Sequence, residues 1–314
     1  MPRPPILPGV VLLGVLNLLV GCSRDRDAGP AKTPFVLAIQ PTSTPEKLSA
    51  RSAELEAFLE ARMEGVDVKI HVPTLYAGTI EALRFGHADA AFVGAWPARI
   101  AVDRAGARVV LGEIREVFAH GERLEAPSYS SYWIVKPDSA IQTLADLRGK
   151  KVAFPSRLST SGYVFPMARL VADNLIEAGA DGVDPSAYFG EVLYAGGYAQ
   201  GLEALEKGQV DATLIAGDVP QALYDKALQS MRVIAEQSSI PSHAVVVGGH
   251  VDAELAARFE KALLELGDEA HRPLMRAFVS GIFLRFVETD AETHLAGLRG
   301  ALDSTRLGFT ETLR

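Results

Sequence analysis

The chain has 314 residues, of which 48% are hydrophobic and 22% charged, and its formal net charge is −8. This length suits one large or two medium domains, and the apolar content excludes disorder over most of the chain. The acidic balance argues against a nucleic-acid partner, which would need a strongly basic face. A single cysteine excludes an internal disulfide and a cysteine-built zinc site, and the seven histidines lack metal-ligand spacing. We therefore expect no metal and no cofactor.

The first 33 residues are predicted to be a targeting and anchoring segment. Residues 6–20 form an apolar run of 15 residues, whereas a membrane-spanning helix needs about 20, so a secretory signal fits better. The run ends Leu-Val-Gly-Cys at Cys22, which resembles a bacterial lipobox. We expect a signal peptide at 1–21, acyl chains such as palmitate on Cys22, and a lipidated tether at 22–33. This predicts a membrane-anchored lipoprotein of the cell envelope, facing the periplasm or the cell exterior. A plain signal peptide with an incidental cysteine is the alternative.

Strands and helices alternate along the rest of the chain. Short apolar or alternating runs predict strands, and apolar residues at helical spacing predict helices. The expected strands are Phe35–Pro41, Val66–Val72, Ala90–Val93, Val109–Glu116, Tyr132–Val135, Lys151–Phe154, Phe189–Tyr194, Val210–Ala216, Arg232–Glu236 and Ala244–Val247. The expected helices are Pro45–Met63, Ala77–Phe85, Thr143–Leu147, Tyr163–Ala178, Ala199–Lys207 and Val219–Leu228, with a mostly helical chain from Ala253 onward. This alternation predicts an α/β protein with parallel sheets.

An internal repeat indicates two similar lobes. Residues 76–90 read YAGTIEALRFGHADA and residues 198–212 read YAQGLEALEKGQVDA, and eight of the fifteen positions match. Each copy predicts a tyrosine at the start of an amphipathic helix, a glycine that ends the helix, a turn aspartate and an apolar strand. A chance match between two unrelated strand–helix–strand turns is the alternative.

The repeat also predicts where a ligand binds. In open parallel sheets, ligands bind beyond the carboxyl ends of the strands. If the lobes face each other, Tyr76 and Trp96 lie on one wall of a cleft, and Tyr198 and Asp218 lie on the other. Two alternatives stay open, because each tyrosine could simply pack on its own helix and Asp218 could be the N-cap of the helix that follows.

A hydroxyl-rich loop, residues 155–163, joins a predicted strand to a predicted helix. The first N–H groups of a helix lack internal partners and its dipole favours anions there. Ser159, Thr160 and Ser161 can each donate a hydrogen bond to an oxygen, and Gly162 allows the backbone to approach a ligand. Arg157 is the only basic residue of the loop, which suits an anion site that must also release its ligand. An ordinary Ser/Thr N-cap is the alternative.

At this point the sequence resembles a family. The pattern is carried by Tyr-Ser-Ser at 129–131, Asp-Leu-Arg-Gly-Lys at 146–150, Val-Ala-Phe at 152–154, Ser-Thr-Ser-Gly-Tyr at 159–163 and Pro166. It is similar to the central pattern of periplasmic substrate-binding proteins of phosphonate, phosphite and phosphate ABC transporters. The resemblance covers residues 34–250 and is most specific over 129–170.

The resemblance implies a fold. It is a two-lobed periplasmic-binding-protein-like clamp of type II, with two doubly wound α/β lobes joined by two crossing strands near residues 128–132 and 239–243. Lobe one would comprise 34–128 plus 243–314, and lobe two 129–242. It also implies a monomer that captures a phosphorus oxyanion and delivers it to an ABC transporter permease, and that binds to the membrane only through its lipid.

The resemblance implies roles for the site residues as well. The hydroxyls at 159–161 would hold phosphorus-bound oxygens, with Ser131 nearby and Tyr76 on the cleft wall. Tyr198 stands where the family usually has a histidine. Asp218 falls where several members place an acid that meets a substrate amine, and an unpaired carboxylate there would favour an amine-bearing or protonated ligand over a dianion.

Other functional classes remain as alternatives. The sequence has no Gly-x-Ser-x-Gly elbow, Walker motif or Gly-x-Gly-x-x-Gly, so we expect that the protein is not an enzyme, and pairing Ser161 with His243 or His250 as a catalytic set would be a guess. The runner-up is a ligand-sensing lipoprotein that uses the same clamp to feed a membrane signalling partner. A structural lipoprotein without a ligand is the third possibility.

Overall fold

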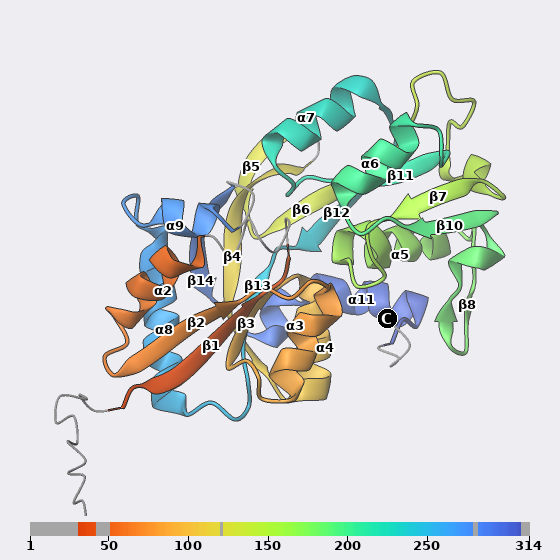
Figure 1. The fold of residues 1–314 in the computed structure, drawn as a ribbon. Helices are drawn as coiled ribbons and strands as arrows, with labels where there is room; N and C mark the ends of the chain where they lie inside the picture. Colours follow the sequence, from red (N-terminus) through yellow and green to blue (C-terminus); the bar gives the residue numbers. More distant parts are fainter. Residues whose placement is uncertain (1–30, 42–50, 120–121, 279–281, 309–314) are drawn as a thin grey trace, which may run out of the picture. The chain divides into compact units, whose positions relative to one another are not determined.

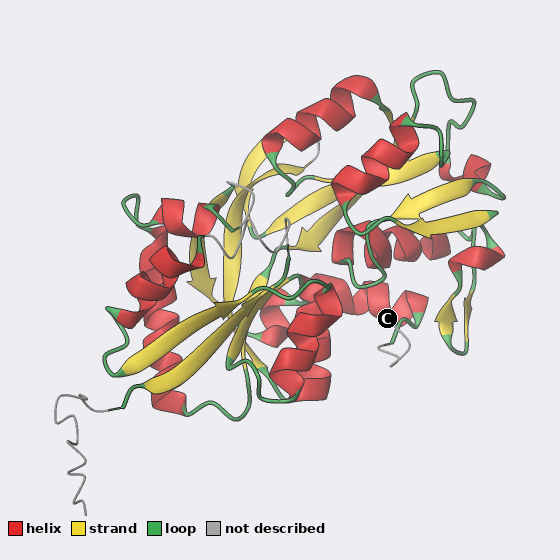
Figure 2. Cartoon of the chain, in the orientation of Figure 1, coloured by secondary structure: helices red, strands yellow, loops and turns green. Residues whose placement is uncertain are grey.

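Strands of the chain fall into two large sheets and one small hairpin in the computed structural model (Figures 1 and 2). The structure describes residues 31–41, 51–119, 122–278 and 282–308. Residues 32–314 group as one compact unit, separate from residues 1–31. The predicted signal peptide, Cys22 and most of the tether lie outside the described residues.

The first sheet has the strand order β14-β4-β13-β3-β1-β2, with β5 paired to β4. Its strands are β1 Thr33–Ile39, β2 Val66–His71, β3 Ala90–Val93, β4 Arg108–Ala119, β5 Glu122–Ala126, β13 Ala244–Val247 and β14 Phe283–Glu288. The second sheet has the order β10-β7-β11-β6-β12. Its strands are β6 Ser128–Val135, β7 Lys151–Phe154, β10 Glu191–Tyr194, β11 Ala212–Ala216 and β12 Arg232–Pro241, and β8 Ala178–Gly179 pairs with β9 Gly182–Val183 as a separate hairpin.

Helices cover both faces of each sheet. The α-helices are α2 Ser52–Glu60, α3 Tyr76–Arg84, α4 Ala95–Ala105, α5 Phe165–Ala172, α6 Tyr198–Glu206, α7 Gln221–Ser230, α8 Ala253–Leu264, α9 Arg272–Arg276, α10 Ala291–His294 and α11 Ala296–Thr305. Shorter turns are the 3₁₀ segments η1 Leu144–Leu147, η3 Pro185–Ala187 and η4 Glu265–Gly267, and the π-helical turn η2 Thr160–Val164.

The alternation of side chains along the strands produces two cores per sheet. In β1, Phe35, Leu37 and Ile39 pack on the α2 and α8 side, while Val36 and Ala38 pack on the α3 and α4 side. In the second sheet, Trp133 packs with α5 on one face, and its neighbours on β6 pack with α6 and α7 on the other. A strand covered on both faces is apolar throughout, which is why β3 and β11 are buried at every position.

Both sheets are mixed, so the expectation of parallel sheets was wrong in part. The pairs β1–β2, β1–β3, β7–β10 and β7–β11 are parallel, whereas β13, β14, β5, β6 and β12 form antiparallel pairs. The cause is the path of the chain, which passes between the sheets twice, once after β5 and once between β12 and β13. β13 begins where the chain returns from the second sheet. It therefore runs antiparallel to its two neighbours, β3 and β4.

Other predicted elements differ from the observed ones in instructive ways. The described part of the helix expected at 45–63 is α2, and residues 42–50 lie outside the described residues. The helix expected at 163–178 is replaced by the π-helical turn η2 and the shorter α5. Strand β14 lies in the region expected to be mostly helical, and β5, an exposed strand that reads Glu-Arg-Leu-Glu-Ala, has no apolar alternation to reveal it.

The predicted lobe boundaries stay a prediction, and helix α11 complicates them. Leu298 and Ala301 of α11 pack in the core beside α4, on the first sheet, and the same helix also contacts α5 and β12 of the second. The segment 243–314 therefore touches both sheets. No helix within the described ranges is long and apolar enough to cross a membrane.

Candidate functional site

The hydroxyl-rich loop forms a buried helix start. Ser159, Thr160 and Ser161 are each at most 6% exposed, and the Ser159 hydroxyl accepts the Gly162 N–H at 3.0 Å as the N-cap of η2. The N-cap alternative therefore holds for Ser159 alone. A Cβ on Gly162 would lie 2.1 Å from the Pro155 Cγ, so this position needs glycine for close packing.

Ser161 lies at the centre of a group of hydroxyls from three elements. The Tyr129 hydroxyl of β6 donates to the Ser161 Oγ at 2.9 Å. The Ser161 Oγ and the Tyr198 hydroxyl of α6 lie 2.6 Å apart, and the Ser159 Oγ lies 3.4 Å from the same hydroxyl. The sequence predicted Ser161 and Tyr198 as site residues, and the structure brings them into direct contact.

Thr160 connects this loop to the first sheet. The Trp96 N–H, at the start of α4, donates to the Thr160 Oγ1 at 2.9 Å. Two helix starts, η2 and α4, thus face each other across one hydrogen bond. Trp96 was predicted as a cleft-wall side chain, but it is its backbone amide that meets the hydroxyl loop, while the indole is 5% exposed and packs among apolar side chains.

The two tyrosines of the repeat reach the same group of residues. The Tyr76 hydroxyl bonds to Gln40, whose Oε1 also accepts the Gly94 N–H at 3.2 Å. Burial and the negative charge of Asp218 raise the pKa of Tyr76 to about 12, and the same two causes raise the pKa of Tyr198. The rings of both tyrosines also pack in the cores beside their helices. Each tyrosine therefore packs on its own helix through its ring, as the alternative proposed, and reaches the other site residues through its hydroxyl.

Asp218 is buried and paired. Its Oδ2 lies 2.7 Å from the Arg115 Nη1 of β4, and the Tyr129 hydroxyl also interacts with its carboxyl group. Burial raises the pKa of Asp218, and Arg115 opposes that shift. The cap of α7 is Pro220 with no side-chain hydrogen bond, so the N-cap alternative for Asp218 was wrong. The premise that the Asp218 carboxylate is unpaired was wrong too, because strand β4 of the first sheet supplies Arg115 as its partner.

Arg115 belongs to a buried ionic group that the sequence interpretation missed. Its Nε bonds to Glu113 on the same strand, and burial raises the pKa of Glu113 to about 7 although Arg115 opposes the shift. His243 lies 3.9 Å from the Asp218 Oδ2, and burial first, then Arg115, lowers its pKa well below the usual range. Two opposite charges two residues apart in the strand predicted at Val109–Glu116 were the available signal.

Several buried polar atoms of this region have no hydrogen-bond partner among the described residues. They include the Arg115 Nη2, the Ser131 Oγ and both ring nitrogens of His243. Ser131, a predicted site residue, pairs with Ala216 and Gln237 in the sheet. Ala216 is two residues before Asp218 in the sequence. Unpartnered buried donors are costly, so such atoms mark places where an acceptor from a ligand would be favourable.

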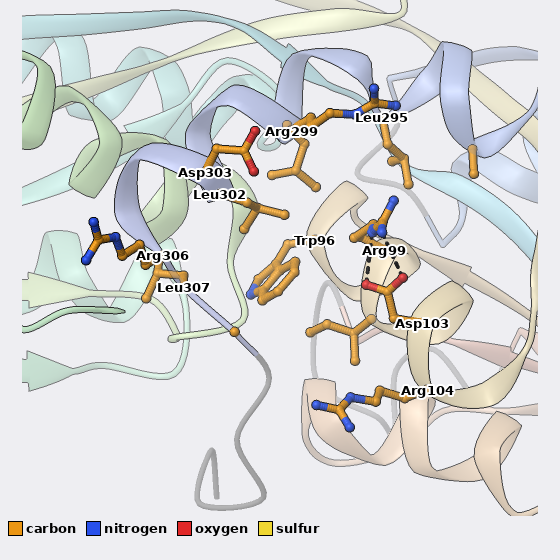
Figure 3. A pocket seen from close by; sticks show the side chains of 14 residues that line it. Trp96, Arg99, Asp103, Arg104, Leu295, Arg299, Leu302, Asp303, Arg306 and Leu307 are labelled. Atoms are coloured by element: carbon orange, nitrogen blue, oxygen red, sulfur yellow. Dashed lines mark hydrogen bonds and ion pairs between the residues drawn. The ribbon is translucent and has the colours of Figure 1, made fainter. Parts of the chain in front are cut away.

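A cavity of about 740 Å³ lies elsewhere, between α4 and α11 (Figure 3). Its wall carries four arginines, of which Arg99 pairs with Asp103, and its apolar side includes the Trp96 indole. None of the hydroxyl-loop residues lines it. Trp96 is therefore the one predicted site residue that touches both this cavity, through its indole, and the hydroxyl loop, through its amide.

Comparison with known proteins decides the family. Residues 37–294 match the family described as ABC transporter, phosphonate, periplasmic substrate-binding protein. The chain belongs to this family. A substrate-binding protein of this family lies outside the cytoplasm, and the resemblance seen in the sequence is confirmed, as is the two-lobed α/β fold class.

Relatives with curated names agree with this assignment. The chain is 30% identical over 179 residues to the phosphate-import protein PhnD of Mycolicibacterium smegmatis, covering 57% of this chain and 53% of that protein. It is 32% identical over 189 residues to the phosphonates-binding periplasmic protein of Escherichia coli, covering 58% and 51%. The aligned part therefore spans about half the length of these relatives.

A solved structure shows the same fold. A binding protein component of an ABC phosphonate transporter from Pseudomonas aeruginosa superposes with a TM-score of 0.69 over 87% of each chain, at 21% identity. The family is one of substrate-binding proteins, while the expectation that this chain has no enzymatic activity stays a prediction.

Proposed function

We propose that this protein captures a small phosphorus oxyanion of the phosphonate, phosphite or phosphate type and delivers it to an ABC permease. The observation that carries the proposal is the convergence of Ser161, Tyr129 and Tyr198 hydroxyls at a buried helix start, within hydrogen-bonding distance of one another. Hydroxyls and helix-start amides bind oxyanions through dipoles, which allows tight but reversible capture. Membership of the phosphonate substrate-binding family supports the same ligand class.

Six of the predicted residues bind the ligand in this proposal. The hydroxyls of Ser159, Thr160 and Ser161 and the first amides of η2 hold the oxygens of the ligand. Tyr76 and Tyr198 close the site from the two copies of the repeat, and Ser131 adds a buried donor. Both tyrosines are protonated at neutral pH, as an ordinary tyrosine is, and burial raises their pKa values further, so both remain donors to an anion.

Release requires that the two sheets separate, and the chain is built for such a movement. Within the described residues the chain passes between the sheets after β5 and between β12 and β13, which is the arrangement of a hinge, and helix α11 also contacts elements of both sheets. The hydrogen bond from the Trp96 N–H to the Thr160 hydroxyl spans the two sides and is broken when they part. In this proposal the ligand bridges the same two sides, so that binding favours the closed form in which the protein docks on its permease.

The anchor is a separate part of the proposal. Cys22 is the only cysteine of the sequence and ends a lipobox-like tetrapeptide. We propose that residues 1–21 are removed, that Cys22 is acylated, and that the chain stays on the membrane as a monomer. Acyl chains on this residue should place the protein in the membrane fraction, whereas Cys22→Ala should release it without loss of ligand binding. Equal membrane association of the two would contradict the anchor.

Isothermal titration calorimetry of the purified protein tests the ligand class. Methylphosphonate, phosphite, phosphate and 2-aminoethylphosphonate form the panel, with sulfate as the matched oxyanion control. We expect saturable binding of at least one phosphorus compound and at least about tenfold weaker binding of sulfate, the difference that 1.4 kcal/mol produces. A folded protein that binds none of the panel would contradict the proposed function.

A further inference from the structure

A buried ionic group lies beside the hydroxyl loop. It comprises Glu113 and Arg115 of β4, Asp218 after β11, and His243 between β12 and β13. Each of the four side chains is at least nine-tenths buried. Arg115 holds the group together, because its Nε bonds to Glu113 and its Nη1 to Asp218 at 2.7 Å.

One tyrosine joins this group to the hydroxyls of the site. The Tyr129 hydroxyl donates to the Ser161 Oγ at 2.9 Å and also interacts with the Asp218 carboxyl group. The charge of Asp218 also acts on Tyr76 and Tyr198, whose pKa values it raises. Asp218 and its partner Arg115 therefore lie close enough to influence which ligand the hydroxyl loop accepts.

Next to Asp218 the charges favour an acceptor over an ammonium, while the second carboxylate of the group, Glu113, is bound to Arg115 and keeps one buried oxygen without a partner among the described residues. The Asp218 carboxylate already has a cation in direct contact, and His243 adds none because burial keeps it neutral. The Arg115 Nη2 is buried and donates to no acceptor among the described residues. An arginine with an unused buried donor gains from an additional oxygen, whereas a second cation would meet like charge.

We propose that Arg115 is a specificity-determining residue that occupies, from within the protein, the position an ammonium group of a ligand would take against Asp218. The inference rests on the proposed function and narrows it to phosphorus oxyanions that carry no amine. An aminoalkylphosphonate would have to displace a buried guanidinium from its carboxylate, and breaking a buried ion pair is strongly unfavourable. A ligand without an amine leaves the pair intact and offers its oxygens to the free Nη2.

The first test compares two ligands that differ only in the amine. Wild-type protein is titrated with ethylphosphonate and with 2-aminoethylphosphonate at the same pH and ionic strength. We expect ethylphosphonate to bind at least about tenfold more tightly, as for a loss of 1.4 kcal/mol. Equal or tighter binding of 2-aminoethylphosphonate would overturn this inference and leave the proposed function intact. Silence of the whole phosphorus panel would overturn the proposed function and this inference with it.

The second test changes the charges. Arg115→Met removes the cation from Asp218 and should reverse the preference in favour of 2-aminoethylphosphonate, and adding Asp218→Asn should abolish that reversal. Arg123→Met, at an exposed arginine of β5, is the matched control and should leave the preference unchanged.

If Arg115→Met does not fold, Asp218→Asn alone is informative. In that variant Arg115 still pairs with Glu113 but has lost the negative charge of Asp218, so more of its positive charge is available to an anion. We expect the preference for ethylphosphonate to grow by about tenfold, and an unchanged ratio would overturn the inference.

Discussion

Residues 76–93 and 198–215 can be compared position by position, because each is a helix, a glycine turn and a strand. In the first copy the Asp89 N–H donates to the Val36 carbonyl at 2.8 Å, and the Asp89 carboxylate accepts the Val36 N–H at 2.7 Å. In the second copy Asp211 makes the same two bonds to Lys151, at 2.7 and 2.9 Å. The turn aspartate thus fixes the strand that follows to its neighbour in both sheets.

The copies differ immediately after their strands. The first copy continues into Gly94 and the start of α4, whose amides meet Gln40 and Thr160. The second continues into Gly217 and Asp218, and the acid pairs with an arginine from the first sheet. The shared part of the repeat therefore builds the scaffold, whereas the divergent ends supply different chemistry to one site.

The largest expected effect is on stability, at two positions where one copy has glycine and the other has alanine. Ala95 corresponds to Gly217, and Gly94 corresponds to Ala216. A Cβ on Gly217 would lie 2.0 Å from the Phe118 carbonyl oxygen, which is backbone and cannot move aside cheaply. We expect Gly217→Ala to lower the free energy of unfolding in urea by about 3 kcal/mol, as overpacking does.

The matched control is Gly94→Ala, in the first copy. Its Cβ would find no atom nearer than the Thr160 Oγ1 at 3.6 Å, and its backbone conformation, φ −63°, suits alanine. We expect a change within about 1 kcal/mol. Similar losses for both variants would show that the ends of the two copies are not packed differently.

The next effect is the pH dependence that Glu113 introduces beside Asp218. Burial raises the pKa of Glu113 from its ordinary 4.5 to about 7, so the folded chain keeps a proton that the unfolded chain has released. The stability contributed by this proton is complete below about pH 4.5 and is lost as the pH rises through about 7. Relative to Glu113→Gln, wild-type protein should therefore lose about 3 kcal/mol between these limits, at 1.36 kcal/mol per pKa unit.

Urea unfolding of both proteins across that pH range measures this difference, and groups common to the two cancel in the comparison. A difference between the two proteins that does not change with pH would mean that Glu113 titrates as an ordinary surface acid, and that the ionic group is open to water.

A smaller effect separates the two tyrosines. Tyr198 contacts two hydroxyls of the loop, at 2.6 and 3.4 Å, while the one side-chain hydrogen bond described for Tyr76 is to Gln40. We expect Tyr198→Phe to weaken binding of the best phosphorus ligand by about thirtyfold and Tyr76→Phe by about fivefold, since each lost bond is worth about 1 kcal/mol. Calorimetric titration measures both, and a larger loss for Tyr76→Phe would mean that the first copy dominates recognition.

The smallest expected effect tests the shared scaffold. Asp89→Ala and Asp211→Ala each remove the same side-chain acceptor for a strand N–H, so each should lower the free energy of unfolding by about 1 kcal/mol. Neither carboxylate contacts the hydroxyl loop, so ligand affinity should not change. An affinity change in only one of the two variants would show that one copy's turn belongs to the site.

Much of this organisation could be predicted from the sequence, because local patterns determine it. The repeat located both tyrosines, and the strand–hydroxyl loop–helix order placed Ser161 at a buried helix start. The pairing of Asp218 with Arg115 could not be predicted, since the two residues are 103 positions apart and meet only when the chain crosses between sheets. The same crossings reversed β13 against β3, which no local pattern reveals.

The central claim is that hydroxyls at the start of η2 hold a phosphorus oxyanion. The most direct measurement is the affinity of a triple variant, Ser159→Ala, Thr160→Ala and Ser161→Ala, for the best phosphorus ligand of the wild-type protein. The control is Ser156→Ala, at a residue of the same loop whose hydroxyl accepts the Leu158 N–H. We predict at least about a hundredfold loss in the triple variant, because hydrogen bonds to charged groups are worth about 1.5–3 kcal/mol each, and wild-type affinity in the control. Undiminished affinity in a folded triple variant would contradict the account.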